Sequence, residues 1–166
     1  LVGQRRGNRQ MTILREVMAA AELLKADWGV AADVWSATSY NELRRDGMAA
    51  ERWNRIHPGS EPRVPYVTEV LGEGKGPVVA VSDFMRAVPD QVARWVPRPY
   101  VSLGTDGFGR SDTREQLRRF FEVDEGHVVV ATLSQLAVEG AVPEDRVVDA
   151  LRRYEIDVEA AVPWSG

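Results

Sequence analysis

The spacing of apolar residues predicts that helices and short buried strands alternate along this chain. Over residues 13–28 the apolar side chains recur at helical intervals, and Gly29 follows where a helix commonly stops. Three short, mostly apolar runs, at residues 30–35, 78–82 and 100–103, have the composition of strands buried on both faces of a parallel sheet. Strands separated by helices predict an α/β domain of three α/β/α layers around a mostly parallel sheet.

Capping residues predict where the other helices begin. Ser39 and Glu42 have the S-x-x-E spacing of a capping box, in which each side chain accepts the other residue's backbone N–H. Asp112 and Glu115 repeat that spacing, and Pro suits the first turn of a helix. The further helices expected are 39–53, 66–71, 89–96, one after Asp112, one that Asp124 caps, and one that Pro143 opens.

The composition is that of an ordinary globular domain, and it excludes several kinds of site. Among 166 residues, 44% are hydrophobic, and 21 Lys and Arg oppose 25 Asp and Glu, which gives a net charge of −4. Without cysteine, and with two histidines, the chain has no cysteine nucleophile and no cysteine- or histidine-rich metal site. The negative charge argues against nucleic acid as a partner, and no apolar run approaches the ~18 residues of a membrane span. We therefore expect a cytoplasmic protein without membrane partners.

Residues 1–11 differ from the rest of the chain in charge and pattern. They contain Arg5, Arg6 and Arg9, the first acidic residue is Glu16, and no strand pattern is present. We expect an irregular basic leader over residues 1–11, solvated rather than a binding arm, followed by one domain over residues 12–166.

Small polar and acidic residues follow each expected strand, at the edge where parallel α/β sheets bind ligands. They are Ser36, Thr38 and Ser39, then Ser82 and Asp83, then Gly104, Thr105 and Asp106. Helix capping and turn formation account for these residue types. A small-molecule site near Ser82 and Asp106 is a weaker alternative.

The segment 104–112 is the densest motif, with three glycines in six residues and Arg110 as a fork for carboxylate or phosphate. It lacks the lysine and hydroxyl residue of a Walker loop, and the segment 72–77 has Pro77 at the place of that hydroxyl. Residues 105–107 resemble the start of the magnesium motif of thiamine diphosphate enzymes. That motif needs a downstream asparagine as an oxygen ligand, and every asparagine lies upstream. We therefore predict that this chain alone binds no cofactor and no metal.

No set of residues predicts a self-contained active site. A Gly-x-Ser-x-Gly nucleophile elbow is absent, and His57 and His127 are interpreted as structural or exposed histidines rather than general bases. Asp124 and Glu125 stand at a helix N-terminus, where the helix dipole accounts for them. We predict no catalytic residue.

Several segments together resemble the C-terminal domain of the homodimeric bacterial pyruvate dehydrogenase first component. The relation to transketolase C-terminal domains is looser, and the resemblance covers about residues 13–157. The segments that carry it are Asp33-Val-Trp-Ser36, Glu42-Leu-Arg-Arg-Asp46, Glu51-Arg-Trp-Asn54, His57-Pro58, Pro62-Arg-Val-Pro-Tyr66 and Gly104-Thr-Asp-Gly-Phe-Gly-Arg-Ser-Asp112.

The resemblance implies a parent enzyme that decarboxylates pyruvate on thiamine diphosphate with magnesium and then acetylates the lipoyl group of a dihydrolipoyl acetyltransferase. In that family the two preceding domains hold cofactor and metal across the dimer interface. The resemblance therefore implies a structural and assembly role, with the upstream domains, a second subunit and the acetyltransferase complex as partners. It places Asp106, Phe108, Arg110 and Ser111 at a domain or subunit contact.

The start of the chain departs from the family pattern, which opens with a strand and a Gly/Ser turn. Because residues 1–11 show no strand pattern, we expect a sheet that lacks one strand and has an unpaired edge. A truncated or frame-shifted gene product would explain this departure. The alternative to an enzyme fragment is a freestanding, non-catalytic module that docks on the pyruvate dehydrogenase complex.

Overall fold

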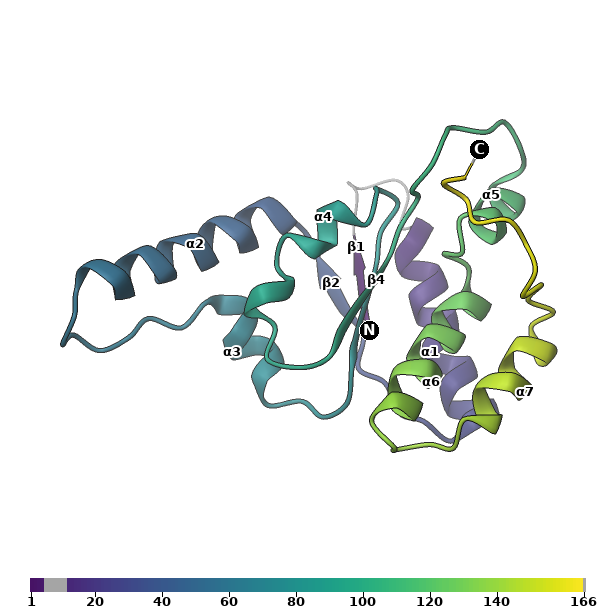
Figure 1. The fold of residues 1–166 in the computed structure, drawn as a ribbon, viewed down its shortest axis with the longest axis horizontal. Helices are drawn as coiled ribbons and strands as arrows, with labels where there is room; N and C mark the ends of the chain where they lie inside the picture. Colours follow the sequence, from purple (N-terminus) through teal and green to yellow (C-terminus); the bar gives the residue numbers. More distant parts are fainter. Residues whose placement is uncertain (5–11, 166) are drawn as a thin grey trace.

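The computed structural model describes residues 1–4 and 12–165, and its centre is a parallel sheet of four strands. The order across the sheet is β2-β1-β3-β4, and Val2 stands opposite both Trp35 and Ala80 (Figure 1). Every residue of β3 is buried, as expected for a parallel strand with helices on both faces. The strands are β1 (Val2–Gln4), β2 (Trp35–Ala37), β3 (Val78–Val81) and β4 (Tyr100–Leu103).

The expectation that residues 1–11 contain no strand, and that the sheet lacks one, is wrong. β1 lies between β2 and β3, and the Trp35 amide donates to the Leu1 carbonyl at 2.8 Å. Three residues are too few to show a hydrophobic period, so nothing in the sequence pattern marks them as a strand. Gly3 lets β1 lie close to α1, because a Cβ there would lie 2.8 Å from Leu14 Cδ1 and 3.1 Å from Leu14 Cα. Residues 5–11 of the expected leader lie outside the described residues.

Helices cover both faces of the sheet, which confirms the expected α/β/α fold class. One face carries α1 (Thr12–Trp28), α6 (Glu125–Val138) and α7 (Asp145–Arg153), with α5 (Arg114–Phe120) near the start of α1 (Figure 1). The other carries α2 (Tyr40–Ile56), α3 (Tyr66–Gly72), α4 (Ala87–Asp90) and a 3-10 helix, η1 (Ala93–Trp95). No helix in the described ranges is both long and apolar enough to cross a membrane.

Each face of the sheet packs on its own apolar core. β3 contributes to both, because successive side chains point to opposite sides: Val79 and Val81 to one, Val78 to the other. The core under α1 and α6 contains Ile13, Val17, Ala20, Leu24, Val128, Val129 and Leu133. The core under α2 and α3 contains Ala37, Tyr40, Val67, Leu71, Val92, Trp95 and Val96.

Several expected boundaries change. The first expected strand, at 30–35, is realised only at Trp35–Ala37, because pairing with β1 decides which residues extend. The expected helix 89–96 is divided into α4 and η1. Asp112 does not cap α5; the Thr113 hydroxyl accepts from the Gln116 amide at 3.3 Å.

Two predicted caps are confirmed. The Ser39 hydroxyl accepts from the Glu42 amide at 3.2 Å, and an Asp124 oxygen accepts from the His127 amide at 2.9 Å. These bonds join residues three apart, so local sequence suffices to predict them.

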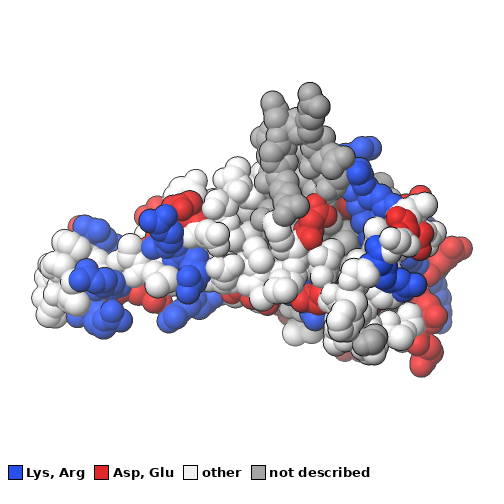
Figure 2. Space-filling view, turned by 90° about the horizontal axis from the view of Figure 1, so that it is seen from above, with Lys and Arg blue, Asp and Glu red and all other residues white. Residues whose placement is uncertain are grey.

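The outer part of α2 projects from the body of the domain, and residues 57–65 return beside it (Figure 1). We call this unit the α2 arm. The Asn54 side chain accepts from the Arg63 amide at 2.7 Å and donates to the Arg63 carbonyl at 2.9 Å. The Trp53 ring stacks on His57 with centroids 3.5 Å apart, and the Arg63 guanidinium lies 3.7 Å from the Trp53 ring centroid. Basic and acidic side chains are interspersed along the arm (Figure 2).

Candidate functional site

The loops that follow β3 and β4 lie together at the carboxyl edge of the sheet, and Asp106 joins them. Its Oδ2 accepts from Arg86 Nε at 2.8 Å, and both of its oxygens lie within 3.3 Å of the Arg86 amide nitrogen. Thr105 donates its amide to the Phe84 carbonyl and its hydroxyl to the Asp83 carbonyl. The Arg86 guanidinium also lies 4.5 Å from the ring centroid of Trp164, so the C-terminal segment joins the same cluster.

The resemblance of residues 105–107 to a magnesium motif does not extend to the geometry. The Asp106 carboxylate is already bonded to the Arg86 side chain and main chain. Gly107 has φ +117° and contacts the Pro163 main chain, so the turn packs against this chain's own tail. Asp106, Arg86 and Gly107 hold the loops after β3 and β4 and the C-terminal segment together, and we call them the Asp106 latch. They do not fit a magnesium site.

Of the four residues expected at a domain or subunit contact, one is bonded within this chain and three are exposed. Asp106 is part of the latch just described. Phe108 is 74% exposed, Ser111 is exposed, and Arg110 is exposed with its guanidinium 4.2 Å from the Phe120 ring centroid. A surface around Phe108 is therefore accessible, and its role as a contact stays a prediction.

The other expected strand-end residues form separate groups. Ser82 and Asp83 lie beside Thr105 and Asp106, because β3 and β4 are neighbours, and the Ser82 hydroxyl accepts from the Phe84 amide at 3.0 Å. Thr38 and Ser39 follow β2, which β1 separates from β3, whereas Ser36 lies within β2, so the expectation that it follows the strand is wrong. The weaker alternative is one small-molecule site at Ser82 and Asp106. Both side chains are already hydrogen-bonded within these loops, which does not favour that site.

Both histidines make structural contacts. His127 Nδ1 lies 2.7 Å from Asp124 Oδ1, and His57 Nδ1 lies 3.0 Å from the Trp53 carbonyl oxygen. Burial opposes the charged form of Asp124, but hydrogen bonds from His127 and the charge of Arg119 outweigh it and hold the pKa of Asp124 below its ordinary value. In the part of the chain that the structure describes, no group of three or more His, Cys, Asp or Glu side chains is arranged to hold a metal.

Glu16 is a partly buried carboxyl group at the junction of α1, α5 and α6. It contacts the Arg118 guanidinium. Burial, followed by a hydrogen bond with Glu125, raises the pKa of Glu16 to about 7, although the charge of Arg118 opposes this shift. The sequence gives no sign of this group, because its partners lie about a hundred positions away along the chain.

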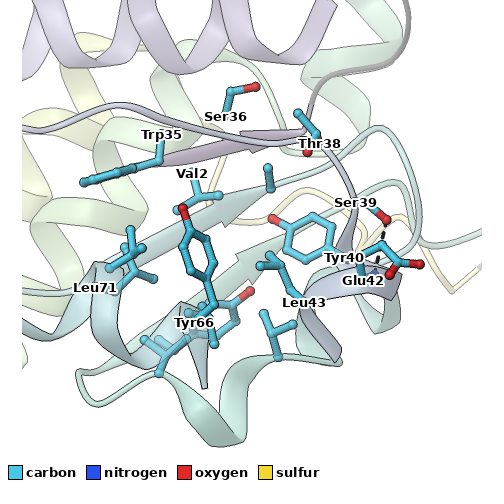
Figure 3. A pocket seen from close by; sticks show the side chains of 16 residues that line it. Val2, Trp35, Ser36, Thr38, Ser39, Tyr40, Glu42, Leu43, Tyr66 and Leu71 are labelled. Carbon is cyan, nitrogen blue, oxygen red and sulfur yellow. Dashed lines mark hydrogen bonds between the residues drawn. The ribbon is translucent and has the colours of Figure 1, made fainter. Parts of the chain in front are cut away.

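A hollow, which we call the apolar pocket, lies between the sheet and helices α2 and α3 and has a volume of about 320 Å³. Figure 3 shows the Tyr40 and Tyr66 rings within it, with Val2 and Leu71 around them. Tyr40 is 3% exposed, and its hydroxyl has no hydrogen-bond partner among the described residues. Burial raises the pKa of the Tyr40 hydroxyl, so it stays a neutral donor. The sequence pattern does not indicate this pocket, because a tyrosine next to a cap residue carries no sign of burial.

Comparison with known proteins identifies the domain. A family model described as the transketolase-like TK C-terminal domain matches residues 12–124, more than half of the chain. The chain belongs to this family. The matched residues include both loops of the Asp106 latch. They also include the residues that line the apolar pocket, apart from Val2.

The curated relatives are all described as pyruvate dehydrogenase E1 components. The chain is 54% identical over 153 residues to the relative from Pseudomonas aeruginosa, which covers 92% of this chain and 17% of that protein. It is 53% identical over 146 residues to the relative from Mycobacterium tuberculosis (88% and 16%), and 49% identical over 153 residues to that from Escherichia coli K12 (92% and 17%). The chain therefore spans about one sixth of these relatives and matches their C-terminal part, which confirms the resemblance found in the sequence.

Proposed function

We propose that this chain serves as the structural and assembly domain at the C-terminal end of a pyruvate dehydrogenase first component. The observation that carries the proposal is a continuous match at about 50% identity over nine tenths of this chain, confined to one sixth of each relative. The parent enzyme decarboxylates pyruvate and acetylates the lipoyl group of dihydrolipoyl acetyltransferase. It works in the cytoplasm as a homodimer. Thiamine diphosphate and magnesium are bound by the domains that precede this one.

The polar side chains of this domain support a structural role. Asp106 is used by Arg86, Asp124 by His127, and Glu16 by Arg118. Each of these contacts joins two segments of the domain or caps a helix, so each side chain already has a structural partner. Chemistry then belongs to the rest of the parent enzyme, and the chain alone is expected to be inactive.

Assembly is proposed to use the surface around Phe108. Phe108 is 74% exposed, and a partner that covers its ring would remove apolar surface from water, which favours association. Arg110 and Ser111 flank it and supply a polar rim, as protein interfaces commonly have. The occupant of this surface is the remainder of the same enzyme, within one subunit or across the dimer.

A segment exchange tests this function. We would replace the matched 153 residues of the Pseudomonas aeruginosa relative with the corresponding residues of this chain. The chimera is expected to decarboxylate pyruvate in the presence of thiamine diphosphate and Mg²⁺, whereas the 166-residue chain alone shows no turnover and no heat of thiamine diphosphate binding. A folded chimera that is inactive, or turnover by the isolated chain, would contradict the proposal.

The contact surface is tested in the same chimera with Phe108→Ala. The variant is expected to weaken subunit or domain assembly about tenfold, measured by analytical ultracentrifugation, because it removes a central apolar contact. Val138→Ala is the matched control, since Val138 is 80% exposed and lies at the end of α6. Equal effects of the two substitutions would show that Phe108 has no special role.

A further inference from the structure

A cavity of about 470 Å³ lies at the carboxyl edge of the sheet, beside the Asp106 latch. Its walls come from the loops after β3 and β4 and from α5. The lining residues that matter for its chemistry are Asp83, Thr105, Arg110, Arg114 and Arg118. This is the edge of a parallel α/β sheet at which ligands generally bind, and the volume suits a small molecule or one side chain of a partner. We call it the arginine cavity.

Three guanidinium groups from the described residues line the arginine cavity. Arg114 and Arg118 stand four residues apart on α5, so their side chains leave the same side of the helix. Arg110 comes from the loop before α5, and its guanidinium is held over the Phe120 ring. At the end of the molecule opposite the α2 arm, Figure 2 shows Lys and Arg side chains with Asp and Glu side chains among them.

The positive charges of this cavity are only partly balanced. Arg118 is paired with Glu16 behind the cavity wall. Within residues 1–4 and 12–165, Arg110 and Arg114 have no carboxylate partner, and Asp83 is the one acidic residue on the wall. Three like charges around one hollow repel one another, and an anion between them converts that repulsion into attraction.

We propose that the arginine cavity binds an anionic group with two or more oxygens, a carboxylate or a phosphate. Arg110 and Arg114 donate to its oxygens, because a guanidinium presents two parallel N–H groups that match a carboxylate or phosphate. Arg118, positioned by Glu16, forms the rear of the site. This site goes beyond the assembly role and shares Arg110 with the surface around Phe108, so its binding of a free anion is tested on the isolated chain.

Two sources can supply the anion, and they share this chemistry. One is a free carboxylate or phosphate compound in solution. The other is an Asp or Glu side chain from the part of the parent enzyme that lies outside this chain. In the Pseudomonas aeruginosa relative, that part is more than four fifths of the protein.

Thermal unfolding of the 166-residue chain tests the site with inorganic phosphate and with succinate as probes. Ionic strength is kept constant with NaCl. A ligand that binds only the folded chain raises Tm progressively with its concentration, so we expect Tm to rise with at least one probe. Arg114→Gln and Arg110→Gln are each expected to weaken binding at least about tenfold, since each removes a charged hydrogen-bond donor. Arg44→Gln is the control, because Arg44 is exposed on α2 and does not line the cavity.

No rise in Tm with either probe, or an equal rise in Arg114→Gln and the unmodified chain, would overturn the proposal. The same measurements on the chimera distinguish the two sources. If phosphate no longer raises the Tm of the chimera, and the Arg114→Gln chimera assembles more weakly, the anion is a carboxylate of the parent enzyme. A retained response identifies a free anion. Chimera activity is measured without phosphate. If the isolated chain binds phosphate but the chimera is inactive, the assembly role alone is overturned.

Discussion

The two faces of the sheet are filled differently. Under α1 and α6, side chains such as Ile13, Val17 and Leu133 are 0% exposed and close the core against β3. Under α2 and α3, the apolar pocket of about 320 Å³ remains, and the Tyr40 hydroxyl lies in it without a partner among the described residues. The first face is therefore filled, whereas the second has empty volume and a hydroxyl without a described partner, so we expect shortening a side chain to cost more stability on the first face.

The helices explain this difference. α1 and α6 pack along each other over the sheet, with valine and alanine at the contact. α2 packs on the sheet only near its beginning and then projects as the α2 arm (Figure 1). Its buried residues are Tyr40, Gly47 and Ala50, out of 17. A helix that buries so little of its surface leaves the sheet beneath it incompletely covered.

The largest expected effect comes from shortening a leucine on each face. Leu133→Ala should lower the free energy of unfolding by about 3–4 kcal/mol, because it opens a cavity in a filled core. Leu71→Ala should cost only about 2 kcal/mol, because Leu71 already borders the apolar pocket and loses fewer contacts. Urea unfolding measures both values. Equal losses would contradict the difference between the two faces.

A smaller, pH-dependent effect is expected from Glu16 on the filled face. The pKa of Glu16 is raised from 4.5 to about 7, so the folded chain holds a proton that the unfolded chain has already lost. The contribution is fully present below about pH 4.5 and is lost as pH rises through about 7, which lowers the free energy of unfolding by about 2 kcal/mol after allowance for solvent screening of this partly exposed group.

Glu16→Gln should remove this pH dependence, as measured by urea unfolding at pH 5 and pH 8. Glu22→Gln is the control, because Glu22 is exposed on the same helix. If Glu16→Gln shows the slope of the unmodified chain between these two pH values, the carboxyl group is not the source of it.

The smallest expected effect concerns a single hydroxyl in the hollow face. Tyr40→Phe removes a buried hydroxyl without a described partner, so the free energy of unfolding should stay the same or rise by up to about 1 kcal/mol. Tyr100→Phe is the matched control, because the Tyr100 hydroxyl donates to the Pro89 carbonyl at 2.8 Å, and its loss should cost about 1 kcal/mol. Similar losses from both substitutions would show that the Tyr40 hydroxyl is bonded in solution.

Local signals in the sequence predicted much of the fold. The caps at Ser39 and Asp124, the helix that ends at Trp28 and the strand Tyr100–Leu103 depend on residues within a few positions of one another. Strand β1 and the true position of β2 depend on pairing between residues 33 positions apart, as Val2 and Trp35 show, and the sequence pattern missed both.

The candidate site was predicted less completely. Arg110 and Asp106 were singled out from a glycine-rich motif, but their different roles were not, because Asp106 meets Arg86 only when β3 and β4 are paired. Arg114 and Arg118 were not singled out from the sequence, because basic residues are common on the exposed side of a helix. Their surplus of positive charge is apparent only once α5 is placed against the carboxyl edge of the sheet.

By itself, the sequence determined the fold class, most helices, the family, and the absence of cysteine chemistry, because these follow from residue types and short-range spacing. Only the tertiary structure decided that residues 2–4 form a central strand, that the Tyr40 hydroxyl is buried without a described partner, and that three arginines share one cavity. The reason is physical. Burial and electrostatic balance depend on all neighbours in space, and most of these neighbours are distant along the chain.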